Sequence, residues 1–248
     1  MNLKGVSEVV SYIFIFGIVL TTVAYAYVHI SGIVKDVSEK YKIEGLRESF
    51  KRIQNVFFLS TYGGSVAQEI QIELQGGNLY VSDSPLVNVT IEPAGISYNG
   101  RLASVSFRQG DYRITIENGA VFEDYYGYHR TVVDPRIFLQ KSEIKRVSGE
   151  KEDILVAVFY IVNGNFSLSG YGPVKLTFQS RLNKSYLINE SGTMTIEISS
   201  DFSDRWKEHF ERMGANVSLD GNKVKATLSF DEAVVTIFEV NVSTKLLT

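Results

Sequence analysis

An uninterrupted run of 20 residues without a charged side chain, Val9–Val28, constrains this chain more than any other feature. A helix of roughly 20 apolar residues is long enough to cross the hydrocarbon core of a bilayer. Three polar residues within the run, Ser11, Thr21 and Thr22, can return hydrogen bonds to their own helix. Because the mean hydropathy of the whole chain is +0.01, the remaining residues are polar on average. We therefore expect one membrane segment, not several.

Two familiar kinds of N-terminal segment fit this run. A cleaved secretory signal would use the Ala24-Tyr25-Ala26 sequence and leave Tyr27 as the first mature residue. Against it, Glu8 stands at the start of the apolar run and apolar residues continue to Val34. A plain anchor would instead remain uncleaved and keep Met1.

A third interpretation comes from the residues before the run, Lys4-Gly5-Val6-Ser7-Glu8. They resemble the class III signal of archaeal type IV pilins and archaellins, which a prepilin-type peptidase cuts before the apolar segment. The resemblance implies cleavage after Gly5 and a mature chain that begins at Val6 and keeps the apolar helix. It also marks Glu8 as a candidate assembly residue, although Glu8 would be third in the mature chain, not fifth as in bacterial pilins.

The helical pattern continues beyond the membrane run. Apolar residues recur at spacings of three and four, and charges of both signs fill the other faces; the apolar positions are Ile43, Leu46, Phe50, Ile53 and Phe57. We expect one long helix from about Val6 to Leu59, ended by Tyr62-Gly63-Gly64. Its C-terminal half would pack on a sheet, and small residues of its N-terminal half would allow copies to approach, at Gly17, Thr21 and Ala24.

After residue 64 the apolar period changes from 3.6 to 2, which is typical of strands. Alternation from Ile70 to Val81 around Gly76-Gly77-Asn78 predicts a hairpin. Further strands are expected at 87–91, 103–107, 112–116, 121–123, 132–139, 154–162, 174–178, 193–198, 217–219, 224–230 and 234–242. Turns are expected at Asn99-Gly100, Gly110-Asp111, Asn118-Gly119 and Asp220-Gly221-Asn222.

One short helix interrupts the strands, over residues 203–213. Ser200, Asp201 or Ser203 can serve as its N-cap. Trp206 and Phe210 share one face, which should anchor this helix on a sheet. The predicted fold is therefore α+β: a long N-terminal helix, then a mainly antiparallel β-sandwich-like head with one short C-terminal helix. The expected segments are a leader (1–5), a transmembrane helix (6–34), a stalk helix (35–62) and a β-rich domain (63–248), with a break between two lobes near 148–153.

Asn-x-Ser/Thr sequons indicate the orientation of the chain. Six of the 13 asparagines stand in such sequons, and all six follow the membrane run: Asn88, Asn165, Asn183, Asn189, Asn216 and Asn241. This excess over chance favours N-glycosylation and an extracellular head, although the tripeptide is also common in turns. Net charge follows the same division, because residues 1–34 sum to zero, residues 35–64 to +2 and the remainder to −5.

Residues typical of catalysis or metal binding do not form a recognisable motif. The chain has no cysteine, which excludes thiol catalysis and zinc ribbons, and its three histidines form no H-E-x-x-H pair. His209, beside Glu208 and Glu211, is expected on a solvated helix face. Since no such motif is present, we expect no cofactor and no metal. The net charge of −3 also argues against a nucleic-acid partner.

An aromatic cluster with interleaved charges stands out at residues 122–130. Tyr125, Tyr126 and Tyr128 can form a contact patch, or they can cap a sheet edge with one face buried. Taken together, the sequence predicts a membrane-anchored, glycosylated, pilin-like surface protein that is not an enzyme. Its expected partners are membrane lipid, a prepilin peptidase and other pilin-like subunits. The alternative is a single-pass receptor, adhesin or surface enzyme with no assembly role.

Overall fold

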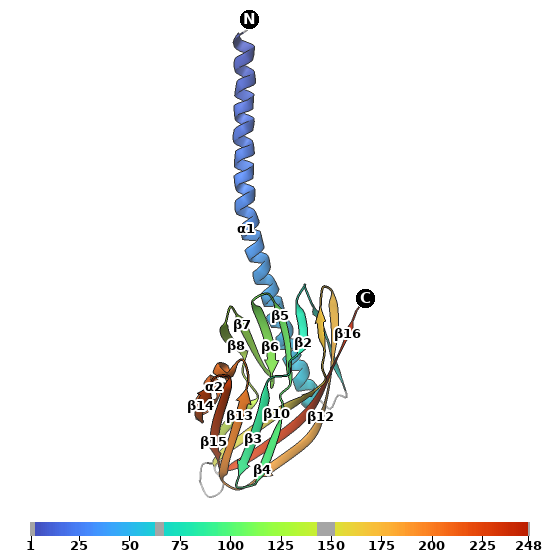
Figure 1. The fold of residues 1–248 in the computed structure, drawn as a ribbon, viewed down its shortest axis with the longest axis vertical. Coiled ribbons are helices and arrows are strands. Elements are labelled where there is room, and N and C mark those ends of the chain that lie inside the picture. Colours follow the sequence, from blue (N-terminus) through green and yellow to red (C-terminus); the bar gives the residue numbers. More distant parts are fainter. Residues whose placement is uncertain (1–2, 63–66, 143–151, 248) are drawn as a thin grey trace. The chain divides into compact units, whose positions relative to one another are not determined.

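The computed structural model describes residues 3–62, 67–142 and 152–247, with side chains throughout these ranges except at 3–9, 35–36 and 138–142. A 60-residue helix, α1 (Leu3–Tyr62), is followed by β-strands and a short helix, α2 (Ser203–Arg212) (Figure 1). The fold is therefore α+β with a β-rich C-terminal part, as predicted. Two compact units are formed, Met1–Leu46 and Arg47–Thr248. We call the second unit the head.

The described strands of the head form three sheets. The first has the order β1 (Gln68–Glu73), β12 (Pro173–Ile188), β16 (Glu232–Leu246), β10 (Glu152–Asn163) and β9 (Ile137–Ser142). The second has the order β11 (Ser167–Ser169), β2 (Asn78–Val81), β5 (Ser104–Gln109), β6 (Tyr112–Glu117), β7 (Ala120–Tyr125) and β8 (Tyr128–Val133). The third has the order β14 (Asn216–Asp220), β15 (Lys223–Phe230), β13 (Gly192–Ser199), β3 (Leu86–Glu92) and β4 (Ile96–Arg101). Every described strand pair is antiparallel except β10 with β16.

The C-terminal turns of α1 belong to the core of the head. Phe50, Ile53 and Phe57 are fully buried, which confirms the expected apolar stripe. The Phe57 ring lies 4.8 Å from that of Phe178 in β12 and 5.8 Å from that of Tyr160 in β10, measured between centroids. Burying each such side chain contributes about 1.5–3 kcal/mol. The first sheet therefore holds this part of the helix.

Several local predictions are confirmed. The turns at Gly110-Asp111, Asn118-Gly119 and 220–222 join β5 to β6, β6 to β7 and β14 to β15. At the second of these, Asn118 and Gly119 both have positive φ, which the asparagine-glycine pair tolerates well. Helix α2 places Trp206 and Phe210 in the core, as its apolar face predicts.

The predicted hairpin from Ile70 to Val81 is wrong. Its two strands form, but β1 pairs with β12 and β2 pairs with β5 and β11, so they belong to different sheets. Backbone hydrogen bonds from Leu74 and Gly76 to the 170–172 loop redirect the chain between the sheets. Partners almost a hundred residues away thus override the local turn signal.

Three further expectations are corrected. The strand predicted at 132–139 is divided between β8 and β9 at Pro135, which has no N–H to continue a ladder. Asn99-Gly100 lies within β4 and pairs with β3, so it forms no turn. The N-cap of α2 is Phe202 without a side-chain cap, because Ser200 Oγ instead accepts the Phe202 N–H at 2.9 Å. The expected lobe break near 148–153 falls mostly on residues outside the described ranges.

A buried carboxylate joins α2 to the second sheet. Glu117 at the end of β6 is 4% exposed, and its Oε2 accepts hydrogen bonds from Ser200 Oγ at 2.7 Å and from Trp206 Nε1 at 2.9 Å. Burial raises the pKa of Glu117 to about 7, although these hydrogen bonds act in the opposite direction. This contact could not be predicted from the sequence, since Glu117 precedes an ordinary turn.

This raised pKa makes stability depend on pH. In the folded state Glu117 holds its proton up to about pH 7, whereas its ordinary pKa is 4.5. Its contribution is therefore complete below about pH 4.5 and declines as the pH rises to about 7, by on the order of 3 kcal/mol. We expect Glu117→Gln, which keeps the shape and stays neutral, to remove this decline. Urea unfolding of the detergent-solubilised chain, followed by Trp206 fluorescence, measures it.

A matched control is Glu190→Gln, which neutralises an exposed glutamate. It should keep the wild-type dependence of the unfolding free energy on pH. Equal slopes for wild type and Glu117→Gln between pH 4.5 and 7 would contradict the assignment.

Candidate functional site

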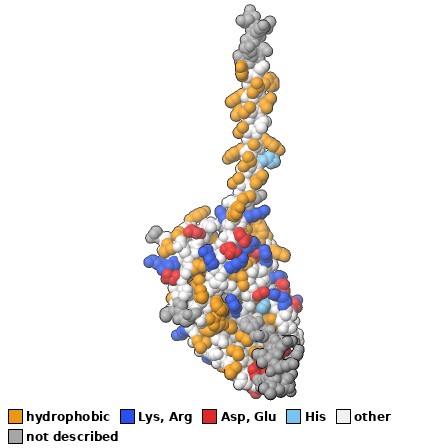
Figure 2. Space-filling view, turned by 180° about the vertical axis from the view of Figure 1, so that it is seen from behind, with side chains coloured by type: hydrophobic (Ala, Val, Ile, Leu, Met, Phe, Trp, Pro, Cys, Tyr) orange, Lys and Arg blue, Asp and Glu red, His pale blue; other side chains and the backbone are white. Residues whose placement is uncertain are grey.

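The N-terminal part of α1 exposes apolar side chains on all its sides. Every large apolar residue described from Val10 to Val34 is at least 46% exposed within the structure, and orange side chains cover this helix in Figure 2. The hydroxyls of Thr21 and Thr22 donate to the carbonyls of Gly17 and Ile18 at 2.8 Å, as expected. By length and composition, this helix can cross a membrane. An apolar surface of this extent in water is unfavourable without cover.

The proposed leader residues Lys4, Gly5, Val6 and Glu8 lie in the first turns of α1. Their side chains fall outside the described part of the chain, so cleavage after Gly5 and a role for Glu8 stay predictions. Gly17, Thr21 and Ala24 are exposed and share one helix face, since 3.6 residues make one turn. A Cβ built on Gly17 would meet nothing within 4 Å. The side chains of this face are therefore small and leave room for the close approach of a neighbouring helix.

The aromatic cluster forms a hairpin between β7 and β8. Its turn consists of Tyr126 and Gly127, with φ of 53° and 79°, and the Gly127 N–H donates to Asp124 Oδ1 at 2.8 Å. Tyr126 is 72% and Tyr128 76% exposed, and the ring of Tyr125 contacts that of Tyr126 at 4.6 Å. The structure therefore brings all three predicted contact residues together. Their rings lie at the tip, open to solvent.

Ion pairs fix the base of this hairpin. Glu123 in β7 is 4% exposed, and its two oxygens accept bonds from Arg47 Nε at 2.6 Å and Nη2 at 2.8 Å. Arg130 in β8 approaches the same carboxylate at 3.6 Å, and Tyr112 donates to it at 3.4 Å. Two-point arginine–carboxylate pairs are the most directional in proteins. The start of the head's helical segment is thereby tied to the hairpin.

All six sequon asparagines are exposed: Asn88, Asn165, Asn183, Asn189, Asn216 and Asn241. Asn165 and Asn189 lie in connections between strands, where a glycosyltransferase reaches the backbone most easily. The Asn183 amide donates to Glu239 Oε1 at 2.8 Å, so modification there would break a contact. The six positions thus differ in how freely they can accept a glycan.

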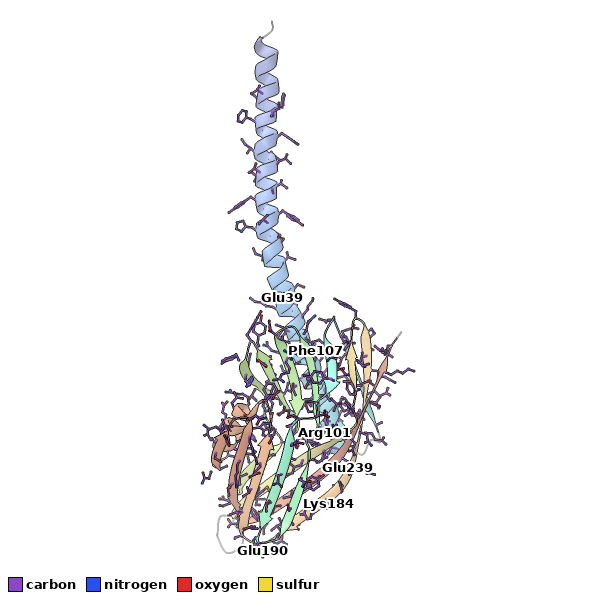
Figure 3. All side chains as sticks on the ribbon, viewed as in Figure 1. Glu39, Arg101, Phe107, Lys184, Glu190 and Glu239 are labelled. Carbon is purple, nitrogen blue, oxygen red and sulfur yellow. The ribbon has the colours of Figure 1, made fainter. Side chains whose placement is uncertain are left out.

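A shallow polar groove of about 510 Å³ lies on the third sheet. Asn88, Asn99, Arg101, Glu197 and Lys223 line it, from four neighbouring strands. Figure 3 labels Arg101, whose guanidinium is held by Asp83 at 3.0 Å and by the Gly164 carbonyl at 2.8 Å. Lys223 pairs with Glu197 at 3.0 Å. Sequence reasoning missed this groove because it assigned Asn99 to a turn. Arg101, Glu197 and Lys223, the charged residues that line the groove, each have a partner within the protein.

The histidines have structural partners. His209 is 7% exposed and its Nε2 lies 2.7 Å from the Ile137 carbonyl, so the expected solvated position is wrong. It sits three residues after Trp206 and therefore on the buried face of α2. Burial lowers the pKa of His209. His129 Nδ1 lies 2.8 Å from Asp204 Oδ1 and links β8 to α2. Among the described residues, no group of His, Asp and Glu side chains could hold a metal ion.

Comparison with known proteins gives a family and one distant relative. A family of unknown function, DUF7289, matches residues 4–244. An uncharacterized protein of Archaeoglobus fulgidus is 25% identical over 272 aligned residues, which cover 89% of this chain and 88% of that protein. No solved structure matches. Since the match extends from the first turns of α1 to within two residues of the end of β16, the chain belongs to the DUF7289 family.

Proposed function

We propose that this chain is a pilin-like surface protein of archaea, anchored by α1 and processed by a prepilin-type peptidase. One observation carries the proposal. A single continuous helix has an exposed apolar N-terminal part, while its C-terminal turns lie in the core of a β-rich head. The helix is preceded by Lys4-Gly5-Val6, which resembles the class III signal. A relative in Archaeoglobus fulgidus, an archaeon, supports an archaeal origin for this chain.

The segregation of side chains along α1 supports a role in anchoring and assembly. Residues from Val10 to Val34 need cover on every side, which lipid supplies in a membrane and other apolar helices supply in a filament. The small face at Gly17, Thr21 and Ala24 allows the second arrangement. Cleavage after Gly5 would make Val6 the first residue and leave this helix intact, both for a place in the membrane and for a place in a filament.

Exposure of the six sequons supports an extracellular head. All of them follow the apolar segment in the chain and each asparagine reaches solvent. The head also relies on its core instead of disulfides, because the chain has no cysteine. The alternative is a single-pass receptor, adhesin or surface enzyme without assembly. It is favoured by the exposed tyrosine hairpin, which offers a ready contact surface.

The mature N-terminus tests the proposal. We expect the protein isolated from the membranes of its own cells to begin at Val6, by intact mass and N-terminal sequencing. Gly5→Val should block processing and retain Met1, because a bulky branched residue would occupy the cleavage position. Ser7→Ala, outside the scissile bond, should be processed normally. A native chain that keeps Met1 would favour the plain anchor, and one that begins at Tyr27 would refute both.

Assembly is tested by cross-linking, which the absence of native cysteine makes clean. We expect oxidation of membranes that contain the Thr21→Cys variant to give a disulfide-linked dimer, because a disulfide needs Cα atoms within roughly 7 Å. Val19→Cys places the thiol about 200° around the helix and should stay monomeric. Equal dimer yields from both variants, on non-reducing gels, would contradict a specific helix contact.

Glycosylation is tested on the native protein by peptide mass mapping. We expect modified peptides that contain Asn165 and Asn189, since both lie in exposed connections between strands. Asn165→Gln should remove one glycan mass and leave the fold unchanged. Asn222→Gln alters an exposed asparagine outside any sequon and should change no glycan mass. Unmodified peptides at all six sequons would contradict this assignment and remove its support for an extracellular head.

A further inference from the structure

Several loops meet at one end of the head. The Gln109 amide donates to the Gln75 carbonyl at 2.7 Å, and the Tyr126 N–H donates to the Asp111 carbonyl at 3.3 Å. The Gly76 N–H donates to the Gly170 carbonyl at 2.7 Å. This continuous surface, which we call the tyrosine face, consists of residues 75–76, 109–111, 125–128, 170–172 and 245–247.

The tyrosine face exposes aromatic and apolar side chains. Tyr126 and Tyr128 project from the hairpin tip, and Tyr171 in the loop before β12 is 84% exposed. Leu246 at the end of β16 is 50% exposed. A tyrosine ring with a terminal hydroxyl suits a boundary where one side is apolar and the other is wet.

This end of the head is also where the chain enters it. Arg47, the first residue of the unit, is bonded to Glu123, two residues before Tyr125. The residues between the expected transmembrane helix, which ends at Val34, and the head are 35–46; these 12 residues span at most ~18 Å as a helix. A linker this short tethers the head within reach of whatever surrounds the apolar segment.

Charge and sequon positions favour the same surroundings. Arg108, Arg130 and Lys245 are exposed on or beside the tyrosine face, together with the acids Glu73 and Asp111, so basic side chains outnumber acidic ones among these residues. Each basic residue near an anionic lipid surface contributes about 1 kcal/mol of attraction. None of the described loops of this face contains an Asn-x-Ser/Thr sequon, whereas the six sequons lie on other parts of the head. Glycans would thus leave this face uncovered.

We propose that the tyrosine face is a lipid-docking surface, which holds the head against the headgroups of the membrane that contains α1. The inference rests on the proposed membrane anchor and adds a second, peripheral contact. The tyrosine rings would lie among the headgroups, and the arginines and lysine would pair with anionic lipid phosphates. Docking needs no bond between chains and is independent of assembly.

Tryptophan fluorescence in lipid vesicles tests the proposal on the full chain. Tyr126→Trp and Tyr171→Trp place reporters on the face, and Leu187→Trp is the control. Leu187 is 68% exposed in β12, near Glu190, which Figure 3 labels at the opposite end of the head from Phe107. The single native tryptophan, Trp206, is fully buried and gives the background in wild type. Vesicles contain phosphatidylcholine and phosphatidylglycerol, with or without bromine on the acyl chains near the headgroup.

We expect brominated lipid to quench both face variants at least about twofold more strongly than Leu187→Trp, because bromine acts only at short range from the headgroup region. Replacing phosphatidylglycerol by phosphatidylcholine should weaken the quenching. Equal quenching in all three variants would overturn the proposal. A second result would also overturn it: an emission of the face variants that is blue-shifted, increases with protein concentration and is not quenched by brominated lipid. Such a result would identify a second copy of the chain as the occupant of the face. Protein that fails to float with the vesicles refutes the anchor itself, a result distinct from floating protein with an unquenched face.

Discussion

The attachment of α1 to two sheets at once is the constraint on which the rest of the head depends. Phe57 packs on the first sheet through Phe178 and Tyr160, and Arg47 binds Glu123 in the second sheet. Removing one partner of a buried ion pair costs about 3–5 kcal/mol, and Arg130 and Tyr112, which also approach Glu123, would offset part of that cost here. The helix therefore combines a segment that is long and apolar enough to cross a membrane with turns that join two sheets of the head.

Much of the fold follows from patterns within single segments. The change of apolar period after residue 64 reflects half-buried strands, and glycine with asparagine or aspartate marks tight reversals wherever φ must be positive. Trp206 and Phe210 could be assigned to a buried face because both lie on one side of a short helix. The aromatic cluster was located for a related reason, since aromatic and charged residues interleave within one short segment, although the sequence left open whether the tyrosines form a contact patch or cap a sheet edge with one face buried.

What the sequence could not predict depends on partners distant in the chain. β1 and β2 are adjacent in sequence, yet their hydrogen bonds go to β12 and β5, so turn chemistry alone gave the wrong pairing. Likewise, Glu117 looks like a surface residue until Trp206, almost ninety positions later, donates to it. The burial of His209 is a different case, because its spacing of three from Trp206 already places it on the buried face of α2. Local sequence reports local conformation, whereas strand order is decided by long-range burial.

The uniform apolarity of the N-terminal helix limits what the head is free to do. A helix that is apolar on all sides gains nothing from choosing one rotation about its own axis in lipid, because every face meets the same hydrocarbon. The rotation of the head about the helix axis must then be set by contacts that differ from one side to the other. These are either a neighbouring helix at the small-residue face or contacts made by the head itself. Aromatic and basic side chains gathered at the end where the chain enters supply such sidedness without a partner. If the tyrosine face docks on lipid as proposed, these contacts would hold the head in one orientation whether or not α1 also contacts a second copy.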